Sequence, residues 1–506
     1  MLKSSLFYTK VSLKSIYFII AMAVTFLDIF TRLIDTLDIS IFLYTKYFLI
    51  PFIFFHIYLL ITSSSMMYQE FKVLSFLEKE KGRKMIAVVL ANIFVTIGFG
   101  LLSVLIMLIF KNSLFSFSTV VRGIGHFLII LLTGSVLAIS IGISTAAFIK
   151  NERSIVVSLA IYGLLIAVTF GDLSDNLITN YLRAFLPDDT FIVFNEIAGV
   201  LLTKEYFADK LVVLCMSVFI LSMTYLLITT TKRKRYFIVP TLALSAFSFL
   251  TIYGFSHQYD FYHAMDVDKI TFEEYEIEDY NMKLDLRHKL ENKAQIKIAI
   301  YENSDTLSFL LDSNFKVEHV LVDNQAAAHT FGNNLLVIHD DFTKGSTVNV
   351  EILYRGKVDI KKDIGSDLFY VSPHAINLVG GDFFWYPSPT IADSIKFNLN
   401  VTANTNLYSN LPILDGHLQG SARYVSIFGG IYNEHTDGDI RYIYPFTMSV
   451  QNIKHVISTA IDEQSAADAN FETLKNKQYR QVIVGARPIH KDLLSVEGST
   501  LYFRLD

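Results

Sequence analysis

The segment GGDFFWYPSP, Gly380 to Pro389, contains the only tryptophan of the chain, Trp385, inside a run of aromatic residues that prolines close. Pro387 and Pro389 cannot donate hydrogen bonds to a β-ladder, so they stop further strand pairing. We interpret the segment as a rigid crossing strand whose aromatic side chains fill the core of a β domain. An alternative keeps these side chains exposed, as a contact for a peptide, the membrane or an exit mouth. They are Phe383, Phe384, Trp385 and Tyr386.

The residues around this segment alternate between apolar and polar in short runs, the period-two pattern of half-buried strands. Turn signals separate the runs, at Asp323-Asn324, Gly332-Asn333-Asn334 and Lys344-Gly345. Many short strands at this spacing predict an all-β, saddle-like or sandwich-like domain over residues 280–506, after a polar linker at 256–279. The runs are YNMKLDLRHKL, AQIKIAIYEN, TLSFLLDS, FKVEHVLVDN, NLLVIHDD, STVNVEILYRG, IKFNLNVTAN and RQVIVGARP.

The first half of the chain is too apolar for an ordinary soluble domain. Hydrophobic residues make up 52% of the 506 residues, and long apolar runs fill the chain only up to about Phe255. A bilayer core of ~30 Å needs ~20 mostly apolar residues per helix. We therefore predict a polytopic α-helical membrane domain of about seven spans, the first being a retained span rather than a cleaved signal. The runs are 15–34, 47–67, 85–110, 123–149, 154–170, 211–230 and 236–255.

Charge and cysteine content exclude some classes of function. A net charge of −5 does not suit a nucleic-acid surface, which needs a clustered basic excess. The single cysteine, Cys215, allows neither an internal disulfide nor a cysteine-based zinc site.

The distribution of Lys and Arg predicts the orientation, because basic residues concentrate in short cytoplasmic loops. If the N-terminus is cytoplasmic, the inner segments hold most of the basic residues, including the cluster at 232–235. An odd number of spans then places the β domain outside the cell. We expect a multi-pass protein of a bacterial cell membrane.

Three segments distinguish the helical domain from a mere anchor. Residues 1–14 combine apolar residues with three lysines, as an interfacial helix before the first span would. Residues 69–84, between the second and third spans, are predicted to form a charged helix with apolar contacts that docks in the cytoplasm. Residues 172–210 include NLITNYLRAFL and FIVFNEIAGVLL, which we expect to form half-helices that dip into the outer leaflet.

This combination resembles the permease subunit of a type-2 ABC exporter, with an elbow helix at 1–14, six core spans within 15–230, a coupling helix at 69–84 and re-entrant helices before the sixth span. Members of that family carry an acidic residue and a lysine where Glu70 opens the loop and Lys84 closes it. The seventh span, within 231–255, is a departure. The resemblance implies that a separate ATPase drives the coupling residues, which are Glu70, Phe71, Leu74, Phe76, Leu77, Glu78, Arg83 and Lys84.

ATP hydrolysis is expected from a partner. The Walker A pattern G-x-x-x-x-G-K-[ST] does not occur, and TKGST at Thr343 to Thr347 has its lysine on the wrong side of the glycine. We expect this chain to bind no cofactor or metal, with ATP and Mg²⁺ held by a cytosolic ABC ATPase subunit.

A few polar residues fall within the predicted spans. Asp28, Arg32 and Asp35 share one face of the first span, so they are candidates for a transport path or, alternatively, a self-neutralised group near the outer interface. His56 and Asn92 are further path candidates and, like His126, favour interhelical hydrogen bonding as the simpler interpretation.

The strand order between about Tyr275 and Pro488, with the Trp385-Tyr386-Pro387 turn, resembles the N-terminal β domain of the gluzincin aminopeptidases, the aminopeptidase N family. In those enzymes an H-E-x-x-H helix of the next domain binds zinc. NEHTD, at Asn433 to Asp437, lacks a second histidine at the required spacing, and the sequence stops about where the catalytic domain would start. Peptidase activity is therefore expected to be absent.

Together these patterns predict the membrane subunit of an ABC exporter, a homodimer or a heterodimer with another permease, in contact with membrane lipids. The cargo expected is a hydrophobic or amphipathic peptide such as a bacteriocin or cytolytic peptide, for secretion or self-immunity; export of drugs, lipids or ions stays open. A membrane-anchored sensor or scaffold, whose outer domain binds a peptide or protein, is the main alternative, and a membrane-tethered peptidase is the third.

Overall fold

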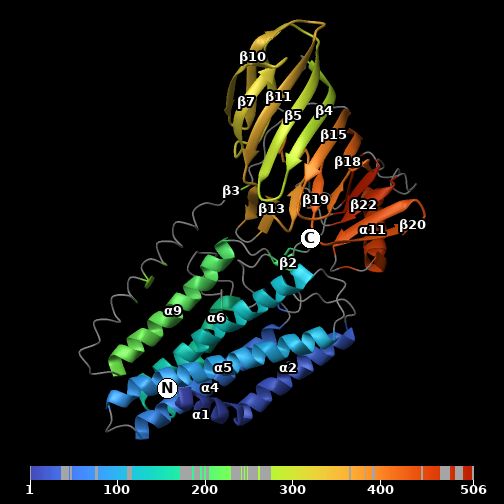
Figure 1. Ribbon diagram of the computed structural model, residues 1–506. Coiled ribbons are helices and arrows are strands. Elements are labelled where there is room, and N and C mark those ends of the chain that lie inside the picture. The colour runs from blue at the N-terminus through green and yellow to red at the C-terminus, as the bar shows by residue number, and fades with distance from the viewer. Residues whose placement is uncertain are drawn as a thin grey trace. The chain divides into compact units, whose positions relative to one another are not determined.

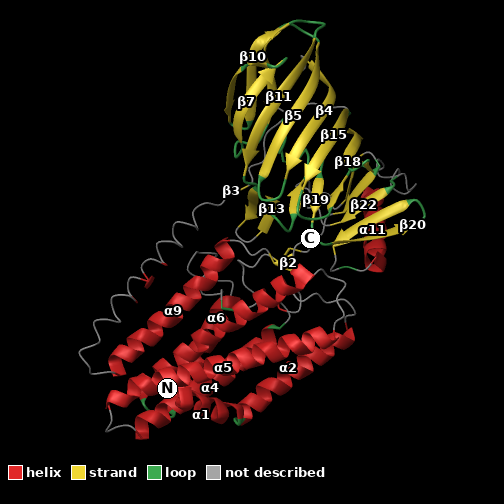
Figure 2. Cartoon of the chain, viewed as in Figure 1, coloured by secondary structure: helices red, strands yellow, loops and turns green. Residues whose placement is uncertain are grey.

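The computed structural model separates the chain into two compact units, which are described one at a time: Met1–Phe194 with Gly199–Gln258, and Asn195–Ala198 with Tyr259–Asp506. Helices make up most of the first unit and strands most of the second (Figure 2). The structure describes residues 2–35, 45, 48–73, 78–110, 117–170, 185–186, 194–195, 199–200, 204–228, 241, 244–245, 248, 260–261, 275–363, 366–381, 383–389, 394–445, 448, 450–467, 479–484, 494–497 and 499–503.

The helical unit is organised around α6, which packs against α4, α5, α7 and α9 (Figure 1). Its interior is formed by aromatic and aliphatic side chains such as Phe52, Phe55 and Phe99, with Phe55 and Phe99 stacked at a ring distance of 3.9 Å. The helices are α1 (Leu2–Leu13), α2 (Ile16–Asp35), α4 (Leu49–Val73), α5 (Glu78–Phe110), α6 (Phe117–Ile149), α7 (Arg153–Phe170) and α9 (Lys204–Ile228).

Four of the described helices are long and apolar enough to cross a membrane: Leu49–Glu70, Lys81–Ile106, Val120–Ile149 and Lys210–Ile228. A fifth span is possible if the pair α1 and α2, bent by 63°, counts as one. A shorter apolar helix covers Arg153–Thr169. The prediction of a helical first half with several helices that could span a membrane is thus confirmed, whereas seven spans are not found among the described residues. The run 236–255 lies mostly outside them.

The bend between α1 and α2 falls at Ser15, where the predicted elbow meets the first predicted span. The Ser15 carbonyl accepts a hydrogen bond from the Phe18 N–H at 3.0 Å, and its hydroxyl accepts one from the Tyr17 N–H at 3.3 Å. A serine in this position caps the first N–H groups of α2, so the chain begins a new helix here instead of extending α1.

The segment FIVFNEIAGVLL, expected to be a half-helix, contains strands where it is described. β1 (Phe194–Asn195) and β2 (Gly199–Val200) form a two-stranded sheet. Asn195 and Gly199 have low helix propensity and favour turns, which explains the difference. Of NLITNYLRAFL, only Phe185 and Leu186 are described, and the rest lies outside the described residues.

The second unit contains several sheets, as predicted, and its largest has eight strands in the order β17-β18-β15-β4-β5-β11-β7-β8. Further sheets have the orders β6-β10-β9, β16-β19-β14-β13-β12-β3 and β20-β21-β22-β24-β23. The bounds are β3 (Asp260–Phe261), β4 (Tyr275–Asp285), β5 (Leu290–Ile300), β6 (Ser304–Leu310), β7 (Lys316–Val322), β8 (Gln325–Ala326), β9 (Ala328–Gly332), β10 (Leu335–Phe342), β11 (Thr347–Gly356), β12 (Asp359–Asp363), β13 (Ser366–Val371), β14 (Ile376–Leu378), β15 (Ile395–Thr402), β16 (Leu407–Ser409), β17 (Ile413–Leu414), β18 (His417–Ala422), β19 (Ile427–Gly429), β20 (Tyr432–Asp437), β21 (Ile440–Pro445), β22 (Gln481–Val484), β23 (Leu494–Glu497) and β24 (Thr500–Phe503).

The turn signals recognised in the sequence are turns in the structure. Asp323 and Asn324 have φ of 45° and 66°, and Asn333 and Asn334 have φ of 51° and 60°. Two successive residues in the left-handed region form the hairpin turn whose twist matches that of the flanking strands. The predicted strands between these turns are confirmed.

Two features of the second unit differ from the sequence-based expectation. β4 begins at Tyr275, so the last residues of the predicted linker, 256–279, are already strand and pair with β5. The second unit is also not all-β, because α11 (Val450–Ala467) covers one face of the sheet that contains β21, β22 and β24. Its apolar residues recur at helical spacing, as Ile453, Ile457 and Ile461, and are buried.

Candidate functional site

Three helices meet through side chains at the base of the α4–α5 hairpin. The Tyr8 hydroxyl of α1 donates a hydrogen bond to Glu70 Oε1, near the end of α4. Lys84 Nζ, near the start of α5, lies 3.8 Å from Glu70 Oε2 and 3.4 Å from the Tyr8 hydroxyl oxygen. Lys84 also lies over the Tyr8 ring, 5.6 Å from its centroid. The Glu70 carboxylate of α4 therefore contacts α1 through one oxygen and α5 through the other. We call Tyr8, Glu70 and Lys84 the hairpin-base cluster.

The cluster is half-open to solvent, with side-chain exposures of 31% for Lys84 and 19% for Glu70. An ion pair this accessible contributes only about 0 to 1 kcal/mol to stability, because solvent screens it. Tyr8, by contrast, is buried. The cluster is therefore better suited to setting the geometry of α1, α4 and α5 than to stabilising the fold.

Two further contacts hold α4. The Tyr68 hydroxyl donates to Glu152 Oε1 at 3.2 Å, which connects α4 to the turn between α6 and α7. The hydroxyls of Ser12 and Tyr58 are hydrogen-bonded, which adds a second link between α1 and α4. The end of α4 is thus tied to neighbours on two sides.

The other predicted coupling residues extend beyond this base. The apolar parts of the two helices end at Glu70 and begin again at Lys81, although α4 continues to Val73 and α5 starts at Glu78. The predicted coupling helix, 69–84, is therefore divided between the end of α4 and the start of α5. Phe71 lies in α4, Glu78 and Arg83 lie in α5 with Arg83 exposed, and Leu74, Phe76 and Leu77 lie outside the described residues.

The candidate path residues are used as links between helices or within one helix. His56 is fully buried on α4, its Nδ1 is 2.7 Å from the Tyr162 hydroxyl of α7, and a Cβ on Gly134 of α6 would lie 2.6 Å from its Cε1. The Asn92 amide donates to Val88 O of its own helix at 3.0 Å, and Thr62 of α4 donates to Asn92 Oδ1 at 3.4 Å.

These geometries match the interhelical interpretation of His56 and Asn92. His126 has a similar place, with Nδ1 2.9 Å from the Tyr206 hydroxyl of α9. Asp28, Arg32 and Asp35 all lie in α2, where Asp28 is half-buried. The structure gives no side-chain surroundings for Arg32 and Asp35.

The aromatic segment of the second unit is part of the core. Phe383, Phe384, Trp385 and Tyr386 are 2%, 8%, 0% and 1% exposed, so they offer no surface to a peptide or to lipid. The alternative in which these four side chains form an exposed contact is therefore wrong. The rings pack on one another and on neighbouring strands, with Phe383 stacked on Phe369 at 4.9 Å and Tyr386 edge-on to Tyr280 at 5.6 Å.

Side chains from distant strands satisfy the backbone of this segment. The Tyr354 hydroxyl donates to Trp385 O at 2.9 Å and the Tyr280 hydroxyl donates to Pro387 O at 2.8 Å. Burial raises the pKa of both tyrosines, so both remain protonated donors. Among the described residues, the segment makes one β-bridge to a strand, in which Ser388 pairs with Leu310 of β6. The segment therefore crosses the core as a plug.

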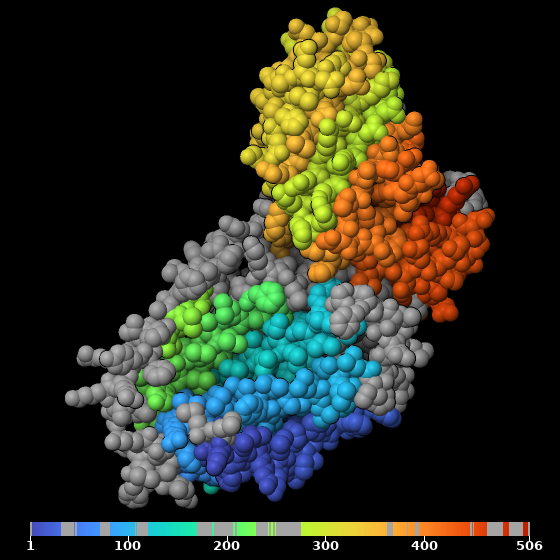
Figure 3. Space-filling model, in the orientation of Figure 1, coloured from blue at the N-terminus to red at the C-terminus, as the bar shows by residue number. Residues whose placement is uncertain are grey.

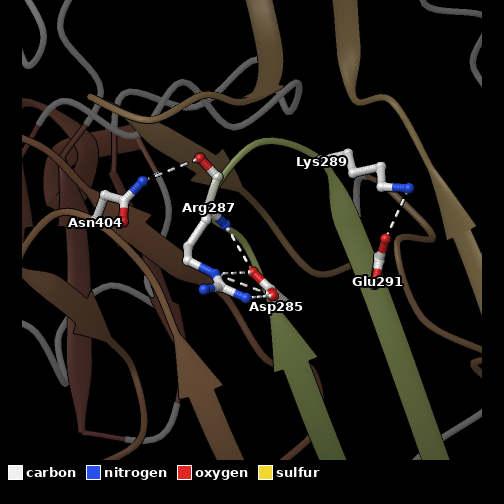
Figure 4. A network of polar contacts seen from close by, with 5 residues as sticks. All are labelled: Asp285, Arg287, Lys289, Glu291 and Asn404. Carbon is white, nitrogen blue, oxygen red and sulfur yellow. Dashed lines mark hydrogen bonds and ion pairs between the residues drawn. The ribbon is translucent and has the colours of Figure 1, made fainter.

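The polar network at the turn between β4 and β5 is a candidate of a different kind (Figure 4). Arg287 Nε donates to Asp285 Oδ1 at 3.0 Å, Lys289 Nζ lies 2.7 Å from Glu291 Oε1, and the Asn404 amide donates to Arg287 O at 3.4 Å. The hydrogen bonds from Arg287 hold the pKa of the Asp285 carboxyl below its ordinary value. Every charge of these pairs has a neighbour of opposite sign, which is typical of a solvated hairpin and indicates no ligand site.

The segment NEHTD does not have the geometry of a zinc helix. Glu434 and His435 lie on the exposed strand β20, and Glu434 Oε2 accepts a hydrogen bond from Arg441 Nη2 at 2.7 Å. Within the part of the chain that the structure describes, no group of three or more His, Cys, Asp or Glu side chains is arranged to hold a metal ion.

Sequence reasoning missed the partners of these residues. Tyr8, Tyr68 and Glu152 were not predicted as site residues, and Tyr162 was not predicted as a partner of His56. A usable signal exists for Tyr8, because Ser5, Tyr8 and Ser12 recur at helical spacing and therefore share one face of a helix.

Comparison with known proteins identifies no family. No protein family model matches the chain, and no curated protein matches it. Similar solved structures include the M1 zinc metallopeptidase from Deinococcus radiodurans, with 10% identity and a TM-score of 0.32 over 46% of this chain and 61% of that chain. Another is a mutant of an M1 zinc metallopeptidase from the same organism bound to a Tyr-Ser-Ala substrate, with 12% identity and a TM-score of 0.33 over 45% and 60%. The chain thus spans about 60% of the length of these peptidases.

Proposed function

We propose that the chain is the membrane-spanning permease subunit of an ATP-driven ABC exporter whose ATPase is a separate subunit. The observation that carries the proposal is the α4–α5 hairpin. Its two helices continue beyond their apolar parts, and the hairpin-base cluster ties both of them to α1. Such a hairpin gives a cytosolic partner a polar extension on two long helices that reach into the membrane.

The hairpin is built to transmit a displacement. α4 and α5 are 25 and 33 residues long, about 37 and 50 Å at 1.5 Å per residue, against a bilayer core of ~30 Å. A push on residues 71–73 or 78–80 therefore acts directly on the end of a long helix. Because Glu70 and Lys84 face each other at the base, the two helices move together, and Tyr8 carries the movement to α1.

The direction and cargo of transport complete the proposal. The basic residues of the short loops support a cytoplasmic N-terminus, which would place the β-rich unit on the outer side. In this scheme two permease subunits enclose the path, and amphipathic peptides leave beneath the outer units. Because Phe383, Phe384, Trp385 and Tyr386 are buried, any peptide contact of the β-rich unit must use other residues. Peptidase activity is not part of this proposal.

The test is coupled ATPase activity. The full chain is co-purified with candidate ABC ATPases and reconstituted in nanodiscs, and we expect amphipathic peptides to stimulate ATP hydrolysis. Glu70→Ala and Lys84→Ala should each reduce the stimulation by up to about fivefold, because an accessible ion pair contributes up to about 1 kcal/mol, which corresponds to that factor. Arg441→Ala, which breaks the comparable exposed pair with Glu434 in the β-rich unit, is the matched control. Stimulation that is unchanged in both hairpin variants would show that the hairpin does not couple to the ATPase.

A further inference from the structure

The helix α1 has two faces of opposite character, and they are reversed relative to an ordinary surface helix. Three of its hydroxyl side chains point inward: Ser5, Tyr8 and Ser12 are 0%, 4% and 0% exposed, whereas Ser4 and Thr9 are half-buried. Tyr8 and Ser12 are the residues that bind Glu70 and Tyr58. A surface helix in water normally turns its apolar stripe to the protein and its polar residues outward. This helix therefore packs as if its outer surroundings were not water.

The outward face of α1 combines lysines with apolar side chains. Lys3 and Lys10 of α1, and Lys14 in the turn that follows it, are all exposed. At about 100° per residue, positions 3, 10 and 14 fall within about 40° of one another, opposite the hydroxyl side chains. Exposed apolar side chains flank this lysine ridge on both sides. They are Leu6 and Leu13, at 56% and 44%, and Phe7 and Val11, at 63% and 43%.

The lysine ridge continues into an apolar surface. Ile16, Ile19 and Ile20 of α2 are 65%, 60% and 46% exposed. The side chains of α1 and α2, dark blue in Figure 3, adjoin one another on the surface of the helical unit. The first acidic residue of the chain is Asp28, so the ridge has no acidic neighbour in sequence. The surface therefore presents positive charge at the edge of an apolar face.

We propose that the lysine ridge binds the headgroups of anionic phospholipids, and that Tyr8 links this binding to the hairpin-base cluster. The occupant follows from the combination of charge and apolar flanks. Lysines with apolar neighbours on both sides fit the boundary between headgroups and acyl chains, where the ammonium groups reach phosphate and the flanks reach hydrocarbon. An acidic protein surface would satisfy the lysines and leave four large apolar side chains without a partner.

The size of the ridge suits a lipid surface. Lys3 and Lys14 are about 16 Å apart along the helix at 1.5 Å per residue, so the lysines do not compete for one phosphate. Each lysine near an anionic membrane surface adds roughly a fivefold preference for it.

On the opposite side of the same helix, Tyr8 contacts Glu70 and Lys84. A shift of α1 on lipid binding therefore acts directly on the base of the hairpin. The significance of this link rests on the proposed exporter function, whereas lipid binding itself needs only that the helices lie in a bilayer.

The first experiment measures lipid selectivity. The full chain is reconstituted in phosphatidylcholine nanodiscs with trace spin-labelled phosphatidylglycerol or phosphatidylcholine, and electron paramagnetic resonance gives the fraction of immobilised label. We expect the wild type to favour phosphatidylglycerol, and Lys3→Gln with Lys10→Gln and Lys14→Gln to lower this preference at least fivefold. The three Lys→Arg changes should retain it. Added inorganic phosphate should not displace the lipid; displacement would assign the ridge to a free anion.

A matched control removes the same charge elsewhere. Lys283→Gln, Lys344→Gln and Lys396→Gln change three exposed lysines of the β-rich unit. We expect these changes to leave the preference as it is. If they lower it as much as the ridge variant does, or if the ridge variant keeps the wild-type preference, the proposal is overturned.

The second experiment tests the link to the hairpin. Hydrogen–deuterium exchange of residues 78–84, at the start of α5, is compared between phosphatidylcholine nanodiscs and nanodiscs that also contain phosphatidylglycerol. We expect phosphatidylglycerol to slow exchange in the wild type, and the change to disappear in Tyr8→Phe, which keeps the ring and the lysines. Exchange that ignores the lipid in the wild type would refute the link. Neither experiment contains an ATPase or a cargo, so a failure here is distinct from a failure of the exporter proposal.

Discussion

The two units of the molecule satisfy their buried hydroxyl groups in different ways. In the helical unit most of these bonds are local: the Thr25 hydroxyl donates to Ala21 O at 2.8 Å, and Ser217 donates to Val213 O at 2.7 Å, each four residues back along its own helix. In the β-rich unit several of them are distant, because Tyr280 donates to Pro387 O at 2.8 Å and Ser409 donates to Ser426 O at 2.7 Å. A helix satisfies its own backbone, whereas the plug crosses the core almost without ladder partners and needs donors from other strands. We infer that the core of the β-rich unit depends on a few specific distant residues, whereas the helical unit depends on how closely its helices approach.

The largest effect is expected at the plug. Trp385→Ala should lower the free energy of unfolding of the β-rich unit by about 3 to 5 kcal/mol, because it leaves a cavity in the core and removes the bond from the indole N–H to Val425 O, at 3.3 Å. The measurement is denaturation of the full chain followed by the circular dichroism of its strands. Ile413→Ala, at a residue 55% exposed, is the control and should change stability by less than about 0.5 kcal/mol. Equal effects at both residues would contradict the plug.

A smaller effect is expected where α4 and α6 meet. A Cβ on Gly142 would overlap Ser63 Oγ and lie 2.9 Å from Leu60 O, whereas a Cβ on Gly163 of α7 meets nothing within 4 Å. Gly142→Ala should destabilise the helical unit by about 1 to 3 kcal/mol, and Gly163→Ala should be neutral or stabilise it by up to about 1 kcal/mol. Helical circular dichroism during titration of micelles with SDS measures both. Both changes gain the same helix propensity, so the difference between their free energies of unfolding reports the contact of Gly142 with Ser63 and Leu60. Equal free energies would mean that α4 and α6 do not approach this closely.

The third comparison makes the same chemical change, Tyr→Phe, in each unit, and the smallest effect is expected in the helical unit. Tyr354→Phe leaves Trp385 O and the Asn292 amide without their hydrogen bonds, which should cost about 1 to 3 kcal/mol. Tyr162→Phe removes the link to His56 between membrane helices, where such bonds average about 0.6 kcal/mol. Urea titration followed by Trp385 fluorescence reports the first change, and SDS titration reports the second. A larger loss for Tyr162→Phe would reverse the contrast between the units.

Much of the fold could be predicted because its signals are local. Alternating residues predicted β4, β5, β6, β7, β10 and β11. The Asp323-Asn324 and Asn333-Asn334 pairs predicted turns, because Asn and Asp adopt positive φ more readily than most residues other than glycine. The sequence patterns failed to predict the right element at two places. Residues 191–202 have a helix-like apolar pattern yet contain β1 and β2, and α11 was not predicted although its isoleucines have helical spacing.

The candidate site could be predicted only in part. Glu70 and Lys84 were recognisable from their places at the two ends of a charged loop. Their partner Tyr8 is 62 residues from Glu70 in sequence, and no local pattern indicates that pairing.

The sequence by itself determined that the first half is rich in membrane-length apolar helices, that the second half is built of strands, and where many of the turns lie. These properties follow from hydrophobic periodicity and from backbone sterics, which act over a few residues. Only the tertiary structure decided that the aromatic residues around Trp385 are buried, that His56 contacts Tyr162, and that α1 turns its hydroxyls inward and its lysines outward. Each of these depends on which distant surfaces meet, and a buried and an exposed aromatic residue have the same local sequence.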